Sequence, residues 1–271
     1  MLRSLVRHWP EYLMEATGLG ILVIAVCSFA LLLIHPDSLL VQAVESAVVR
    51  RLLIGVAMGA TAIGLVYSPW GKQSGAHFNP AVTFTYFRLR RVAGTDAAWY
   101  VLAQLCGALV GMGMMVLIFR RWLSHPAVHF AATMPGPWGA GITWLAEFTM
   151  SALLMTVVLT ATNSRRFSRW TGVFAGLLTV VNVSLLVPII GTSLNPARAL
   201  ASAIPAHIWH GFWVYLTAAP MGMLAAAGLY VRRHGAAAVF CAKLHHENSR
   251  RCIFCQTRGG TKSHSQSDAG M

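Results

Sequence analysis

The 271-residue chain is poor in charge, and above all in acidic residues. Only 11% of its residues are charged, with eight Asp or Glu against 21 Lys or Arg. Apolar residues make up 56% of the chain, and the mean hydropathy is +0.60. This composition excludes an ordinary soluble globular protein. The net charge of +13 does not point to a nucleic-acid partner, because the basic residues lie between apolar runs and in the C-terminal tail, as membrane topology requires.

Cysteine is also scarce, and its placement excludes a secreted disulfide framework. Of the five cysteines, Cys27 and Cys106 lie in apolar runs and the other three lie in the tail. No small-residue cleavage site follows the first apolar run, which predicts a retained first span and not a removed signal peptide. The apolar runs carry no paired nucleophile and base, so we expect no enzymatic activity.

Six apolar runs are long enough to cross a bilayer, which takes about 20 residues of helix. They are Tyr12–Ile34, Val48–Tyr67, Trp99–Phe119, Ile142–Thr162, Trp170–Pro188 and Trp209–Val231. Two further runs, Phe78–Phe87 and Leu194–Ile204, are only about half that length. They predict re-entrant half-helices, which are tolerated at membrane depth where they line a cavity. We therefore expect an all-α membrane protein with six spanning helices and two re-entrant half-helices.

The basic residues predict the orientation of the chain. With six spans both termini lie on one face, and most of the 21 Lys and Arg residues fall in the termini and in the loops of that face. The positive-inside bias then puts both termini in the cytoplasm of a multi-pass protein of the cell (inner or plasma) membrane.

Each short apolar run begins with an Asn-Pro-Ala triplet. The triplets are Asn79-Pro80-Ala81 and Asn195-Pro196-Ala197. Asn caps helix N-termini, and Pro fits the first turn because its missing N–H would be unbonded there. Two half-helices that meet at the membrane midplane place their positive dipole ends and their amide donors around one constriction, which favours neutral solutes and opposes cations and protons. The alternative, two structural caps, suits one triplet better than a matched pair.

The two halves of the chain match each other. Glu15 in the first span and Glu147 in the fourth each precede a triplet, in repeats of about residues 10–120 and 140–232. Three spans per half give the halves opposite orientations. We therefore expect an inverted repeat whose site lies near the bilayer midplane.

The segment from Ser74 to Thr83, SGAHFNPAVT, and the run Asn195-Pro196-Ala197-Arg198 resemble the two signature loops of the aquaporin, or major intrinsic protein, family. The likeness covers roughly residues 10–232. It implies an aquaporin-like channel domain over residues 1–232, with six tilted helices and two half-helices around one pore per subunit, usually in a homotetramer in the lipid bilayer. It also implies a passive channel that passes water or small neutral solutes, excludes ions and protons and requires no cofactor.

The resemblance assigns a selectivity filter. Arg198 matches the family's filter arginine, and the alternative is an Arg that snorkels from a helix end. Thr192 and Val183 match the filter positions of the second loop and the fifth helix, and the second-helix position falls on Gly59 or Ala60. Water-selective relatives favour a bulky aromatic in the second helix and often carry His in the fifth. These small residues therefore predict a wider filter that admits glycerol- or urea-sized solutes as well as water.

Other residues keep alternative functions open. A glycerol- or urea-type facilitator with a wide filter is one alternative, although Ala199 stands where glycerol facilitators typically carry Asp, which argues against glycerol in particular. A secondary active transporter is another, since broken helices in inverted repeats occur there too. It would need an ion-coupling site, and the path offers no carboxylate besides Glu15 and Glu147.

The resemblance gives these two carboxylates a structural role. Intramembrane acids can relay protons, but by their matched positions we expect Glu15 and Glu147 to accept hydrogen bonds from the N–H groups of the re-entrant loops. We expect His77 to fix the first loop through its ring nitrogens, with pH gating as the alternative.

Residues 233–271 form a basic cytoplasmic tail, which we expect to be disordered beyond about residue 258. Cys252 and Cys255 have the spacing of metal ligands, and Cys241 and His245 could complete a tetrahedral zinc site. A cytoplasmic location favours a metal over a stable disulfide. Thiol redox exchange, a tail without any ligand, and binding to anionic lipid headgroups remain open.

Overall fold

The computed structural model describes residues 1–255, and the regular elements found there are all helical. Six helical stretches in that part of the chain are long and apolar enough to cross a membrane. They are α1 (Leu2–Ile34), α3 (Ala47–Tyr67), α6 (Gly94–Leu123), α7 (Gly139–Thr162), a composite fifth span and α11 (Phe212–His234). The composite span joins η2 (Ser168–Trp170), α8 (Thr171–Val181) and the π-helical η3 (Asn182–Leu186). The all-α fold with six spans is confirmed.

Shorter helices fill the connections. They are α2 (Leu39–Ala43), α4 (Pro69–Ser74), α5 (Pro80–Arg88), η1 (His129–Ala131), α9 (Val187–Ile190), α10 (Pro196–Ala206) and η4 (Ala236–Ala238). The two expected half-helices are α5 and α10. Both start at the Pro of a triplet, and both are too short to cross a bilayer.

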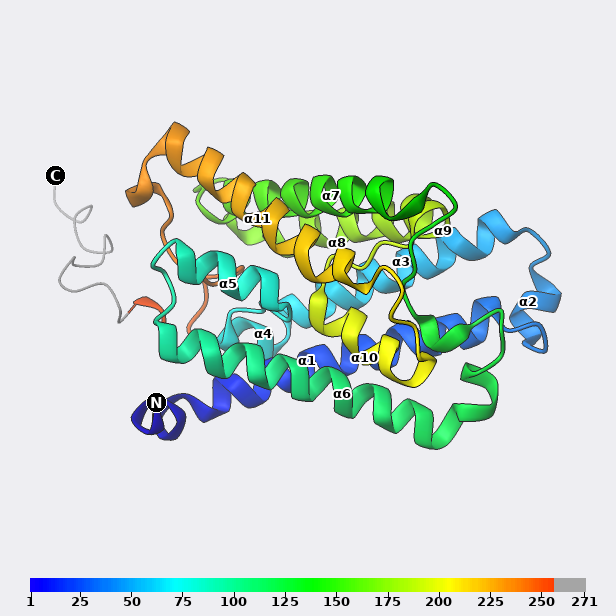
Figure 1. Cartoon of the computed structure of the whole chain (residues 1–271). Coiled ribbons are helices and arrows are strands. Elements are labelled where there is room, and N and C mark those ends of the chain that lie inside the picture. Colours follow the sequence, from blue (N-terminus) through cyan, green and yellow to red (C-terminus); the bar gives the residue numbers. More distant parts are fainter. Residues whose placement is uncertain (256–271) are drawn as a thin grey trace, which may run out of the picture.

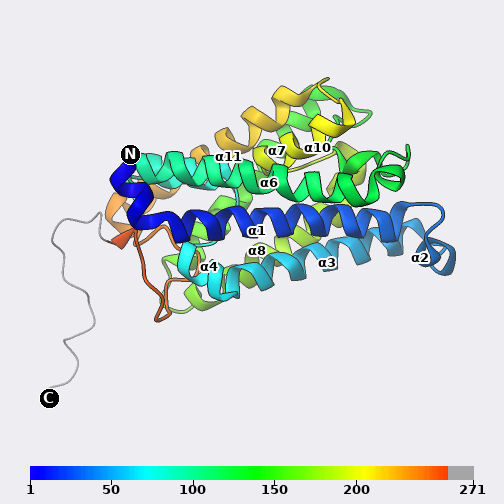
Figure 2. The ribbon, with the colours of Figure 1, turned by 90° about the horizontal axis from the view of Figure 1, so that it is seen from below.

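The spans pair in the same way in each half of the chain. α1 packs along α6 and α7 along α11, while α3 and α8 pack against each other between the halves. Seen from below, α1 lies between α6 and α3 (Figure 2). Glycines permit the close crossings: a Cβ on Gly107 would collide with the carbonyl oxygen of Ala16, and one on Gly111 would lie 2.5 Å from that of Gly20.

One end of the bundle gathers the basic loops and is called the basic end here. The N-terminus and residues 239–255 both lie there (Figure 1). Three contacts tie its segments together: Arg91 donates to the Ala236 carbonyl at 2.6 Å, Tyr67 to the Arg169 carbonyl at 2.6 Å, and the Phe240 N–H to the Asn163 side chain at 2.6 Å. The expectation of disorder beyond about residue 258 lies outside the described residues.

Candidate functional site: a central cavity and a Cys/His cluster

The two half-helices meet end to end through their capping asparagines. Asn79 caps α5 by accepting from the Ala81 N–H at 2.9 Å, and Asn195 caps α10 in the same way. Each amide also donates to the opposite segment, Asn79 Nδ2 to the Leu194 carbonyl and Asn195 Nδ2 to the Phe78 carbonyl, both at 2.7 Å. An amide nitrogen carries two hydrogens. Since both asparagines line the central cavity, the second hydrogen of each is placed to serve a solute there.

The residue before each capping asparagine has a left-handed backbone. The φ angles are +44° at Phe78 and +58° at Leu194, which costs a non-glycine residue about 1–2 kcal/mol. A buried carboxylate holds each of them: the Phe78 N–H donates to Glu15 at 2.6 Å and the Leu194 N–H to Glu147 at 2.5 Å. The same device therefore shapes both segments.

Each carboxylate accepts further hydrogen bonds from its loop. Glu15 also accepts from the Ser74 hydroxyl at 2.7 Å, the His77 N–H at 3.0 Å and the Gln104 amide at 2.7 Å. Glu147 also accepts from the Ser193 N–H at 3.0 Å. Both side chains are fully buried, and their oxygens are occupied by hydrogen-bond donors that fix the loops.

His77 links the first triplet segment to the tail. Its Nε2 lies 2.7 Å from the Ala242 carbonyl and its Nδ1 lies 3.0 Å from the Thr83 hydroxyl. A carbonyl only accepts, so Nε2 carries the hydrogen and Nδ1 accepts from Thr83. The Phe254 ring stacks on the imidazole with centroids 5.5 Å apart. The His77 ring thus joins Thr83 of the first half-helix to the tail.

A cavity of about 700 Å³ passes between the half-helices. Its wall includes residues of both triplet segments and of both ends of the bundle, from Arg50 to Leu244. Apolar side chains dominate that wall, and the polar groups are few. The polar wall residues near the triplets are His77, Asn79, Thr179, Asn182, Thr192, Ser193, Asn195 and Arg198. A mostly apolar cavity with a few convergent polar groups is typical of a solute path.

Three of the four expected filter positions lie in the cavity wall, at Arg198, Thr192 and Val183. Arg198 Nη2 donates to the Ala131 carbonyl at 2.8 Å, and its buried Nη1 has no hydrogen-bond partner among residues 1–255. The Thr192 hydroxyl donates to the Asn182 side chain at 2.8 Å. Nη1 of Arg198 is thus a donor left for a solute.

The second helix contributes other residues to the cavity wall than the two expected from the sequence. The face of α3 in the wall contains Ile54, Met58 and Ala62 at a spacing of four residues, and neither Gly59 nor Ala60 belongs to it. One residue further along a helix turns the side chain by about 100°. Gly59 therefore faces α8, where an added Cβ would lie 2.5 Å from a side chain. Met58, with 5% of its surface exposed, is the wall residue of this helix turn.

Two other features of the cavity wall were not predicted from the sequence. The π-helix at η3 brings the consecutive residues Asn182 and Val183 to the cavity together, as π-bulges at functional sites often do. His129 also lines the cavity, from the segment whose Ala131 carbonyl accepts from Arg198. Neither feature could be predicted from motif spacing, because both depend on local backbone geometry.

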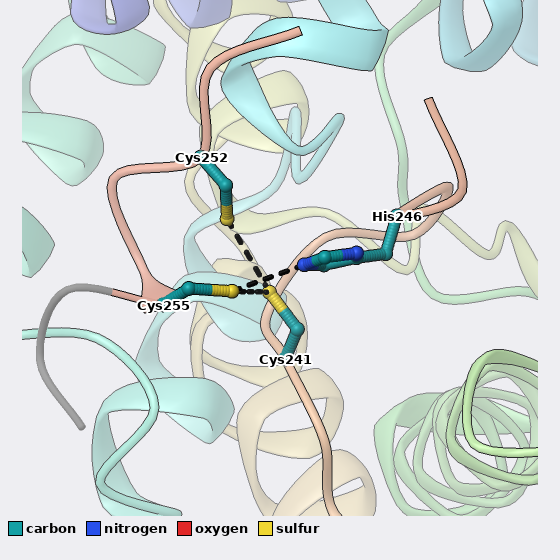
Figure 3. A group of neighbouring side chains, drawn as sticks. All are labelled: Cys241, His246, Cys252 and Cys255. Atoms are coloured by element: carbon teal, nitrogen blue, oxygen red, sulfur yellow. Dashed lines mark hydrogen bonds between the residues drawn. The ribbon is translucent and has the colours of Figure 1, made fainter. Parts of the chain in front are cut away.

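A second cluster lies in the tail. The potential ligand atoms of Cys241, His246, Cys252 and Cys255 all lie within 4.8 Å of one another (Figure 3). His245, the histidine expected from the sequence, lies outside this cluster, and its ring packs edge-on against Tyr67 with centroids 5.2 Å apart. Neighbouring residues of an irregular segment point in different directions, and the spacing alone did not distinguish them.

Hydrogen bonds shift the ionisation of this cluster. Side-chain hydrogen bonds with Cys241, the largest contribution, and with Cys255 hold the pKa of the Cys252 thiol well below its usual range. Bonds with Cys252 and Cys255 raise the pKa of His246 to about 9. The same hydrogen bonds, that with Cys252 first, raise the pKa of Cys241 well above its usual range, so Cys252 is the thiol held as thiolate, the form of cysteine that binds metals.

Comparison with known proteins agrees with this architecture. A model of the major intrinsic protein family matches residues 2–230. A probable NIP-type aquaporin of Nicotiana alata is 35% identical over 178 residues, which cover 65% of this chain and 64% of that protein. Nodulin-26 of Glycine max is 35% identical over 179 residues, with the same shares. The similar region therefore spans just under two thirds of the length of these relatives.

A solved structure shows the same fold. The aquaglyceroporin of Plasmodium falciparum superposes with a TM-score of 0.66 at 21% identity, over 82% of this chain and 95% of that one. Six spans with paired half-helices around a cavity define a helical membrane protein of the channel type. The chain belongs to the major intrinsic protein family, whose aquaporins are passive channels and not enzymes and need no cofactor.

Proposed function

We propose that this protein is a passive transmembrane channel for water and small neutral solutes that excludes ions and protons. The cavity between the capping asparagines carries this proposal. It offers a mostly apolar path with amide donors where two positive helix ends meet. A water or hydroxyl oxygen can accept these hydrogen bonds, whereas a cation meets repulsion and finds no anionic side chain in the wall.

The proposed selectivity filter consists of Met58, Val183, Thr192 and Arg198. Met58 and Val183 give the filter an apolar side, and Nη1 of Arg198 gives it a donor. A thioether is slimmer and more flexible than an indole or phenyl ring. Such a filter suits solutes of glycerol or urea size as well as water.

The hydrogen bonds that the two buried carboxylates accept favour passive flux over ion-coupled transport. Glu15 accepts four hydrogen bonds and Glu147 binds two consecutive loop N–H groups. Neither carboxylate is free to bind a coupling ion.

The proposed setting is the cell membrane, with the basic end in the cytoplasm, following the positive-inside rule. Apolar side chains exposed on the outside of the bundle suit contact with lipid or with neighbouring subunits. On α6 these include Leu102, Val110 and Leu117, which are 48%, 62% and 87% exposed. We propose a homotetramer, as the family resemblance implies.

The width of the filter is tested by Met58→Trp, which adds a large ring to the wall. We expect glycerol and urea fluxes into proteoliposomes to fall by roughly tenfold or more, and the water flux to fall less, because a water molecule needs less width. The matched control is Val56→Trp on the same helix, at a side chain that is 55% exposed. Equal solute fluxes in the Met58→Trp protein and the wild type would remove Met58 from the filter.

A further inference from the structure

Three thiols and one imidazole converge in the tail. Cys241 Sγ lies 3.5 Å from Cys252 Sγ and 3.7 Å from Cys255 Sγ, and His246 Nε2 lies 3.0 Å from Cys255 Sγ. Figure 3 shows the imidazole edge and the three sulfurs pointing toward one another from separate turns of the chain. Four soft donor groups thus surround one small volume.

These separations suit a tetrahedral metal centre. Zinc–sulfur bonds of about 2.3 Å place tetrahedral sulfur ligands about 3.8 Å apart, and three Cys with one His is a common structural zinc set. A disulfide instead requires about 2.05 Å between sulfurs. All five cysteines are free thiols. The geometry therefore favours one shared cation over a disulfide pair.

The charge around the cluster gives independent support. Three thiolates and one Zn²⁺ leave a single negative charge. Lys243 lies within electrostatic range of all three cysteines and is only 1% exposed. Its ammonium donates to the carbonyls of Arg250 and Arg251 at 3.2 and 2.8 Å. A buried ammonium is costly without an opposite charge; an anionic metal centre would supply one, in addition to the buried Glu11 carboxylate, which also lies within its electrostatic range.

The same segment of the tail packs against the channel domain at the basic end. We call residues 239–255 the tail knuckle. The Leu244 N–H donates to the Gly75 carbonyl at 3.1 Å, Ala242 accepts from His77, and Phe254 stacks on the His77 ring. Leu244 of the tail knuckle forms part of the cavity wall.

We propose that Cys241, His246, Cys252 and Cys255 bind one Zn²⁺ ion, and that this ion holds the tail knuckle against the first Asn-Pro-Ala segment. Four protein ligands complete the coordination, so the site is structural and leaves no open position for chemistry. Zinc binding itself depends neither on which solute the channel passes nor on whether it conducts. Only an effect of the tail knuckle on flux rests on the proposed function.

Metal content tests the ligand set. The full chain, purified through a tag without histidine and supplied with equimolar Zn²⁺, is analysed by inductively coupled plasma mass spectrometry. We expect about one zinc per chain in the wild type. Cys252→Ser/Cys255→Ser and His246→Ala should lose it, whereas the matched controls His245→Ala and Cys106→Ser should keep it. A wild type without zinc, or loss in His245→Ala with retention in His246→Ala, overturns the proposal.

Proteolysis tests the docking of the knuckle. Trypsin cleaves after Arg250 and Arg251, whose carbonyls are bound by Lys243 in the docked knuckle. We expect the zinc-loaded protein to resist cleavage there, a chelator to expose the site, and added Zn²⁺ to restore protection. The Cys252→Ser/Cys255→Ser protein should be cut with or without zinc. Equal cleavage of the wild type in both conditions contradicts the docking role.

Water permeability of the same preparations separates this proposal from the previous one. A zinc-free variant that still conducts water shows an intact channel unit, so its loss of metal is attributed to the ligands. Zinc bound to a wild type that conducts no water would uphold the metal site and contradict the channel.

Discussion

Arg198 combines charge and hydrogen bonding at one point of the cavity. One guanidinium nitrogen is anchored to the Ala131 carbonyl and the other is buried without a partner among the described residues. A buried arginine in a membrane is costly and is retained where it faces a water-filled path. The anchored nitrogen fixes the position of the side chain, and we propose that the other nitrogen binds a solute oxygen.

Replacing this arginine tests its role in ion exclusion. We expect Arg198→Val to raise proton or cation leakage into proteoliposomes by roughly tenfold or more, because it removes a fixed positive charge from the path. Leakage is followed with an enclosed pH-sensitive dye under an imposed gradient. Arg121→Val, at an exposed arginine at the end of α6, is the control. Unchanged leakage in Arg198→Val would show that the half-helices alone exclude charge.

The sequence located residues whose place follows from a motif, and it missed residues whose place follows from helix phase or loop geometry. Arg198 and Thr192 have fixed offsets from Asn195, and both line the cavity. Met58 was missed because a one-residue error in counting turns a helical side chain away from the pore. His246 was missed because only the folded turn decides which of two adjacent histidines faces the thiols.

At the scale of helices, close crossings of α1 and α6 bring the first and third spans together. The backbone of α6 approaches α1 at Gly107 and Gly111, where no side chain separates the two helices. Without a hydrophobic driving force between helices in lipid, such close packing contributes to their association. That α1 is the partner helix of α6 at these glycines is known only from the structure.

Paired substitutions on α6 test this crossing. Gly107→Ala should destabilise the protein by about 1–3 kcal/mol or more, because the added methyl group meets the backbone of Ala16. Gly113→Ala has open space around its Cβ and should be neutral or slightly stabilising. Thermal unfolding in detergent, followed by circular dichroism, compares the two. Similar melting temperatures of the two variants would mean that α1 and α6 can move apart at Gly107 with little loss of stability.

At the scale of the whole molecule, two half-helices and six spans enclose a central cavity, and the protein catalyses no reaction. Hydrophobic run length and the matched triplets were enough to predict the six spans and the two half-helices. The π-helical turn at η3 could not be predicted because it depends on local backbone geometry. The folding of the tail knuckle back onto His77 could not be predicted because it depends on contacts between distant parts of the chain. The tail thereby becomes part of the channel wall at Leu244.

The central claim is that solutes pass downhill between Asn79 and Asn195. Stopped-flow light scattering on proteoliposomes, with water, glycerol and urea compared in turn, tests it most directly. We expect water permeability well above that of protein-free vesicles, measurable glycerol or urea flux, and no change in either when a sodium or proton gradient is imposed. Permeability equal to that of protein-free vesicles, or a flux that follows the ion gradient, would contradict the passive channel.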